Sequence, residues 1–130
     1  MTERSGYFGG KWKKGNRQIE VSLPLIIFED GGNQVVFCPA LDISAAGKTD
    51  QEAMIAFETA LGEYLLYTTN KKTFNQDLKS HGWTVKKSVR KPMIPPDMSY
   101  LLQNNDEFNR VFNTRDFRKV NHSVEMPAFA

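Results

Sequence analysis

The sequence is poor in the residues that build disulfides and metal centres. Its 130 residues include one cysteine, Cys38, and two histidines, His81 and His122. A single cysteine excludes an internal disulfide and argues against a zinc site built from cysteines. The two histidines lie far apart in the sequence. We therefore expect no bound metal, no other cofactor and no catalytic histidine.

Long apolar runs are also missing. No run reaches the roughly 18 apolar residues expected of a membrane-spanning helix. Residues 1–15 lack the apolar middle of a signal peptide. We therefore expect a cytoplasmic protein with no membrane segment. The formal net charge is only +2, which by itself does not argue for nucleic-acid binding, because phosphate affinity needs a concentrated basic face.

The first half of the chain predicts a β-hairpin and a short third strand. Apolar and polar residues alternate over 19–25, which is the pattern of a half-buried strand. Pro24 cannot donate to a ladder, so this strand either lies at an edge or breaks there. The "GGN" at 31–33 permits positive φ and predicts the turn into a second strand over 34–38. A loop and a short strand are expected within "ALDISAAGK".

One long helix is predicted next. Thr49 and Glu52 have the spacing of a capping box, in which the hydroxyl accepts from the amide of residue 52 and the carboxylate reaches the amide of residue 49. Gly47 is expected to let the chain turn into the helix. Over about six turns, an apolar stripe recurs at three- and four-residue steps, formed by Ala53, Phe57, Ala60, Leu61, Tyr64, Leu65 and Thr68.

The rest of the chain predicts shorter elements. A short helix should end at Gly82 as its C-terminal cap, followed by a strand from Trp83 to about Val89. The stretch "KPMIPPD" should interrupt regular structure. Two short helices are expected near 99–103 and 106–111, and the alternating end "SVEMPAF" predicts a strand that pairs with this sheet or with that of a second copy.

These elements place the chain in the α+β class: a small, mostly antiparallel sheet with one long helix packed on one face. The order is strand, strand, strand, long helix, short helix, strand. We expect three regions: a mobile N-terminal arm over 1–16, an α+β domain over 17–91, and a C-terminal extension over 92–130 that can serve oligomerisation.

The run from Ile19 to Leu65 resembles the HicB-like antitoxin family. The shared pattern is a hairpin, a proline-bearing loop and a Gly-x-Thr-x-x-Glu-Ala helix start. The similarity covers about residues 17–86, a little over half of the chain. It rests on Gly31, Gly32, Pro39, Leu41, Gly47, Thr49, Glu52 and Ala53, together with "HGW" at 81–83.

The resemblance implies a partial RNase H-like fold that has lost nuclease chemistry. It also implies a bacterial type II antitoxin that binds and masks a small HicA-like ribonuclease toxin. Proteins of this kind commonly form oligomers, so we expect a homodimer. Many add a helix-turn-helix or ribbon-helix-helix segment that binds DNA, but no such pattern follows Pro92.

The expected toxin-binding surface combines a free sheet edge with acidic residues. A ribonuclease that binds RNA carries a basic surface, and acids across an interface complement it. The candidates are Glu29, Asp30, Asp42 and Ser44, the last from the segment 42–46.

A basic cluster offers an alternative function. Lys86, Lys87, Arg90 and Lys91 lie close to Trp83 and could form a phosphate-binding strip of a transcriptional regulator. The same charges could instead protect an edge strand from aggregation, which we favour.

A divalent-metal nuclease is a further alternative, because RNase H-like folds can hold metal ions between carboxylates. The nearest acids are Glu20, Asp42, Glu52 and Glu58. We expect Glu20 on the polar side of its strand, Glu52 in the helix cap and Glu58 off the apolar stripe, so structural roles are favoured. Cys38 lies in an apolar strand, where burial raises a thiol pKa and argues against a nucleophile.

Overall fold

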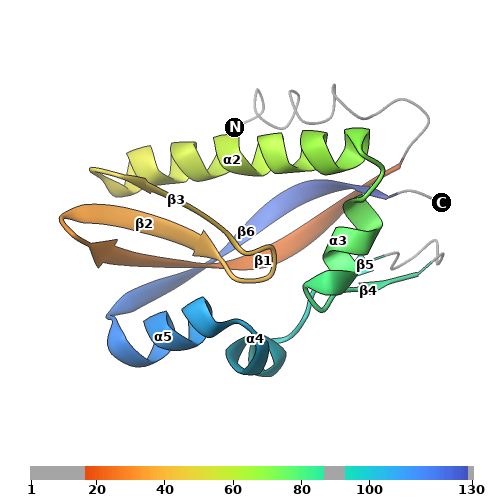
Figure 1. Cartoon of the computed structure of the whole chain (residues 1–130). Coiled ribbons are helices and arrows are strands. Elements are labelled where there is room, and N and C mark those ends of the chain that lie inside the picture. Colours follow the sequence, from red (N-terminus) through yellow and green to blue (C-terminus); the bar gives the residue numbers. More distant parts are fainter. Residues whose placement is uncertain (1–16, 87–92, 129–130) are drawn as a thin grey trace.

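The core of the molecule is a four-stranded antiparallel sheet. A computed structural model describes residues 17–86 and 93–128. The strands are β1 (Arg17–Asp30), β2 (Asn33–Cys38), β3 (Ile43–Gly47) and β6 (Phe117–Ala128), in the spatial order β3-β2-β1-β6. The α+β class expected from the sequence is confirmed, with a mostly antiparallel sheet and a long helix on one face (Figure 1).

Strand β1 has different partners along its length. It pairs with β2 from Ile26 to Asp30 and with β6 from Arg17 to Phe28. Pro24 does not break the strand, because it lies where β2 has already ended and only β6 remains as a neighbour. Gly31 and Gly32 have φ of 60° and 84°, so the glycines supply the left-handed turn that a tight hairpin requires.

Helix α2 (Asp50–Asn70) covers one face of the sheet along 21 residues. The amide of Glu52 donates to the Thr49 hydroxyl at 3.1 Å, as the capping box predicts. The Glu52 carboxylate, however, accepts from the amide of Lys48 at 3.0 Å rather than from that of Thr49. The buried stripe includes Ala53, Phe57, Leu61, Leu65 and Thr68.

Gly47 is required for space at the start of α2. Its φ is not positive, so the predicted role in turning the chain does not depend on left-handed backbone. A Cβ at this position would lie 2.6 Å from the backbone nitrogen of Ala53 and 2.8 Å from the Cβ of Glu52. Any larger residue would therefore separate the first turn of α2 from β3.

Two short helices cover the opposite face of the sheet. They are α4 (Met98–Asn104) and α5 (Asp106–Thr114), and they match the two helices expected near these positions. The rings of Phe37 in β2 and Phe108 in α5 are 6.5 Å apart, and both side chains are buried. The sheet thus has α2 on one face and the α4–α5 pair over part of the other (Figure 1).

The segment after α2 differs in part from the expectation. Helix α3 (Phe74–Ser80) ends as predicted, because Gly82 has a φ of 91° and the amides of Gly82 and Trp83 donate to Lys79 and Leu78. The strand expected over Trp83–Val89 is described only as β4 (Thr84–Val85), and 87–92 lie outside the described residues. Within "KPMIPPD", β5 (Met93–Ile94) pairs with β4, so regular structure is not fully interrupted there.

The fourth strand of the main sheet comes from the end of the chain. Strand β6 pairs with β1 from Phe117 to Ala128, so the terminal strand pairs with this chain's own sheet. In the described residues the strand after Trp83 does not join this sheet, because β4 pairs with β5 instead.

Gly82 gives a test of this packing. A Cβ at Gly82 would lie 2.2 Å from the ring of Tyr100, whereas nothing lies within 4 Å of a Cβ at Gly32. Both glycines have positive φ. We expect Gly32→Ala to lower the free energy of unfolding by about 1 kcal/mol from backbone strain alone. Gly82→Ala should cost somewhat more, about 1–2 kcal/mol, because the partly exposed ring of Tyr100 must also rotate away. A smaller loss for Gly82→Ala than for Gly32→Ala in urea melts would contradict this.

Candidate protein-binding surface

Strand β3 forms one open edge of the sheet. It pairs with β2 on one side, and no strand in the described part of the chain pairs with its other side. Its residues Ser44 and Ala46 are exposed. They lie opposite Phe37 and Val35 in the ladder, and so point to the face that carries α5. The edge is short and uncharged, and all its residues except Ile43 are small, which leaves its backbone accessible to another chain.

Asp42 lies at the turn that leads into β3. It has a φ of 58°, a left-handed conformation that aspartate tolerates better than most residues. The side-chain amide of Asn105 donates to the Asp42 carboxylate at 3.2 Å and to the carbonyl of Pro39 at 3.3 Å. Asn105 also accepts from the amide of Phe108 and so caps α5. The start of α5 is therefore fixed beside Asp42.

A surface depression of about 290 Å³ opens beside this turn. Its rim is acidic and polar, because two carboxylates at the start of α5 lie near that of Asp42. A cationic side chain from another protein would find complementary charge there. The lining residues are Pro39, Asp42, Ser80, His81, Tyr100, Leu101, Asn104, Asn105, Asp106 and Glu107.

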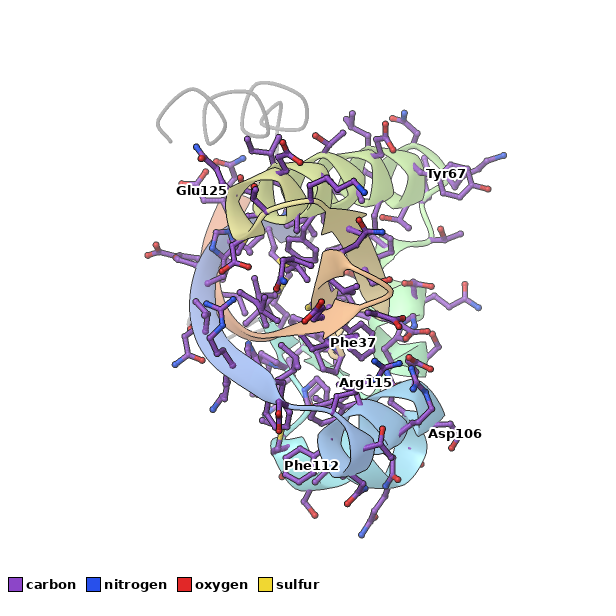
Figure 2. All side chains as sticks on the ribbon, turned by 90° about the vertical axis from the view of Figure 1, so that its left-hand side faces the viewer. Phe37, Tyr67, Asp106, Phe112, Arg115 and Glu125 are labelled. Atoms are coloured by element: carbon purple, nitrogen blue, oxygen red, sulfur yellow. The ribbon has the colours of Figure 1, made fainter. Side chains whose placement is uncertain are left out.

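The other two predicted acids lie at the far end of β2. Glu29 and Asp30 are exposed beside the hairpin turn. The guanidinium of Arg115 pairs with the Asp30 carboxylate at 3.0 Å and donates to the carbonyl of Glu29 at 3.3 Å. Six residues of β2, about 20 Å of extended chain, separate this end from Asp42. The predicted acids therefore form two groups, one beside Arg115 and one beside Asn105 at the start of α5; Figure 2 labels Arg115 and Asp106 of these two regions.

The predicted nucleic-acid strip is largely outside the described residues. Lys86 is exposed just after β4. Lys87, Arg90 and Lys91 lie within 87–92, which the structure does not describe. The regulator hypothesis therefore stays a prediction without a geometric argument.

The acids considered for a metal site point in different directions. The Ser123 hydroxyl donates to Glu20, Asp42 accepts from Asn105, and Glu52 belongs to the helix cap. Glu58 is buried, with 6% of its surface exposed, and pairs with His122 at 3.1 Å. Within 17–86 and 93–128, no three His, Cys, Asp or Glu side chains come together as a metal site would require.

The Glu58–His122 pair was not expected from the sequence. Glu58 was placed off the apolar stripe of α2, but it lies on the buried side, where the helix faces β6. The register that sets His122 beside Leu23 brings its ring under α2. His81 takes the expected position at the end of α3, with Nδ1 2.9 Å from the carbonyl of Asp77.

One buried group and one half-buried group are held neutral. Burial raises the pKa of the Cys38 thiol from 9.0 to about 12. Burial, together with a short hydrogen bond from its hydroxyl to Asp77, also raises the pKa of Tyr64. Both groups favour the folded state while they are protonated. Their contribution is complete below the pKa values of the unfolded chain and is lost as the pH rises through the folded values.

Cys38 should be inert in the native protein. At pH 8 a thiol with a pKa of about 12 is almost entirely protonated, and its side chain is fully buried. We expect iodoacetamide to modify it at least about a hundredfold more slowly in the folded than in the unfolded protein. Mass spectrometry of timed samples measures this ratio. Comparable rates in the two states would show that β2 opens readily.

No described helix is long and apolar enough to cross a membrane. No family model, no curated protein and no solved structure matches this chain.

Proposed function

We propose that this chain is a binding protein of the HicB-like antitoxin type that masks a small, basic ribonuclease. The observation that carries the proposal is the open edge at β3, flanked by Asp42 and the acidic depression. The strand-strand-strand-helix order of 17–70 is the order that the resemblance implies. In this proposal the protein acts in the cytoplasm, where its partner would cleave RNA.

The β3 edge supports docking of a protein. An extended segment of a partner can add to an exposed sheet edge through main-chain hydrogen bonds. Ser44 and Ala46 have small exposed side chains, so a partner strand can approach without a steric barrier. Specificity then depends on the flanking groups.

The flanking charge favours a basic partner. Asp42, Asp106 and Glu107 lie around one depression, and Glu29 and Asp30 lie at the other end of α5. Arg110 and Arg115 partly neutralise these acids, through Glu107 and Asp30. The remaining negative potential would steer the cationic RNA-binding surface of a ribonuclease towards β3.

Co-expression with the adjacent reading frame tests this proposal. We expect the tagged chain to retain a small basic protein through purification, and to stop that protein from cleaving RNA. Failure to retain it, or cleavage that continues inside a stable complex, would contradict the proposal. Magnesium-dependent RNA cleavage by this chain alone would instead support the nuclease hypothesis.

A pair of variants tests the surface. Ala46→Arg places a cation and a long side chain on the exposed face of β3. We expect it to weaken the complex at least about tenfold, or 1.4 kcal/mol. Ser22→Arg makes a similar change at an exposed position of β1 and should leave binding unchanged. Titration calorimetry compares them, and equal effects would place the interface elsewhere.

A further inference from the structure

The opposite edge of the sheet is also open. Strand β6 has twelve residues and pairs only with β1 in the described part of the chain. Natural edge strands are usually short or blunted by charge, because a long edge invites pairing with another chain. In Figure 2, β6 (blue) forms the outer rim of the sheet, with Glu125 beside it.

One face of β6 points towards α2 and the other lies on the side of the sheet that carries α5. Arg118 and His122 point towards α2, where they pair with Asp50 and Glu58. Val120 shares that face and is 37% exposed. Residues 119, 121, 123 and 125 point to the other face, together with Phe117, which contacts Phe112 of α5. Arg118 is therefore already paired, and Lys119 is the cation left to blunt the edge.

A like-charge contact lies next to this edge. Glu20 of β1 and Glu125 of β6 are directly opposite each other in the ladder, an arrangement that destabilises a sheet. The Ser123 hydroxyl donates to Glu20. Neither carboxylate forms an ion pair with any residue in 17–86 or 93–128, and Lys119 forms none either. A cation on the outer side of Glu125 would relieve the repulsion.

A second copy of the chain supplies that cation in one register. Two identical strands that pair antiparallel at an edge are related by a two-fold axis perpendicular to the sheet, so residues that face each other must come from the same face. Centring the axis on His122 places Lys119 opposite Glu125 of the second copy, and Val120 opposite Val124. If the axis is centred on residue 121 or 123 instead, Lys119 no longer faces Glu125 and Val120 no longer faces Val124.

We propose that two copies of this chain pair antiparallel through β6, centred on His122, to form a continuous eight-stranded sheet. Two Lys119–Glu125 pairs then flank the axis on one face. On the other face Val120 lies opposite Val124 of the second copy. This interface does not depend on the proposed function, because β3 and β6 are opposite edges of the sheet. Both edges can be occupied at once.

Charge reversal tests the pairing. Sedimentation velocity of the full chain should give roughly twice the monomer mass of 14.8 kDa. Lys119→Glu and Glu125→Lys should each raise the dimer dissociation constant about tenfold or more, because each turns two attractive pairs into two repulsive ones. The double variant should restore the dimer. Lys79→Glu, an equal charge change at an exposed site in α3, should have no effect.

Cysteine cross-linking tests the register. In the proposed pair Asn121 faces Ser123 of the second copy, and both are exposed. The double variant Asn121→Cys, Ser123→Cys should form a disulfide-linked dimer under mild oxidation, while each single variant should form little. The buried Cys38 does not compete. Three results would overturn the proposal. They are a wild-type chain that stays monomeric at a protein concentration of about 0.1 mM, a dimer that Lys119→Glu does not weaken, and cross-linking of the single variants equal to that of the double variant.

Discussion

Replacement of Phe57 by alanine will lower the free energy of unfolding by about 3–5 kcal/mol. Phe57 lies in the middle of α2 and is fully buried against the sheet. The substitution removes a large apolar side chain and leaves a cavity that the rigid sheet cannot fill. Since a domain of this size has a total stability of about 5–15 kcal/mol, much of that stability depends on this one contact.

Ile55 provides the matched control in the same helix. It is 48% exposed, and Ile55→Ala should change the free energy of unfolding by no more than about 0.5 kcal/mol. Chemical denaturation followed by circular dichroism measures both variants. Similar losses at the two positions would mean that α2 does not pack with its Phe57 side on the sheet.

Removal of the Phe108 side chain should have an effect of similar size. Phe108 is fully buried in α5, where its ring lies 6.5 Å from that of Phe37 and 5.9 Å from that of Phe112. Phe108→Ala removes one of the two fully buried apolar side chains of α5, so we expect a loss of about 3–5 kcal/mol. The loss should appear in a single cooperative transition, because α5 and β6 belong to the same core.

Phe112 gives a graded comparison. It is 41% exposed and contacts the rings of Phe108 and Phe117 at one side. Phe112→Ala should cost less than Phe108→Ala, since 41% of Phe112 is already exposed and less apolar area is taken out of water there. If Phe108→Ala unfolded in two steps, with an early transition, helices α4 and α5 would be unfolding separately from the sheet. That result would contradict the single cooperative transition expected above.

The elements that follow from local chemistry could be predicted from the sequence. The Gly31–Gly32 turn, the Thr49 cap and the Gly82 cap each depend on a few neighbouring residues, and each was confirmed. The apolar stripe of α2 follows from its period and was confirmed as well. Such features need no knowledge of the rest of the fold, because their partners lie within one or two turns of chain.

The fourth strand could not be predicted in the same way. Its ladder joins residues about one hundred positions apart, such as Leu23 and His122, and no local pattern fixes that register. The strand expected after Trp83 and the C-terminal strand both fit the free side of β1 by pattern. In the fold β6 pairs with β1, whereas β4 pairs with β5.

The same long-range pairing explains what was missed at the surface. Glu58 meets His122, and Asn105 fixes Asp42, only because β6 and α5 return to the sheet. The acids of the predicted surface were identified by their charge, but their division into two groups follows from the length of β2. Charge can be read from a sequence, whereas distance requires the fold.

Amide hydrogen exchange on the purified complex shows whether the partner binds at the β3 edge. Amides of residues 43–47 should become protected when the basic partner binds, while those of β6 should not change between the free and bound dimer. Unchanged exchange over 43–47 in a complex that nevertheless forms would contradict this expectation, because the partner would then bind away from the β3 edge.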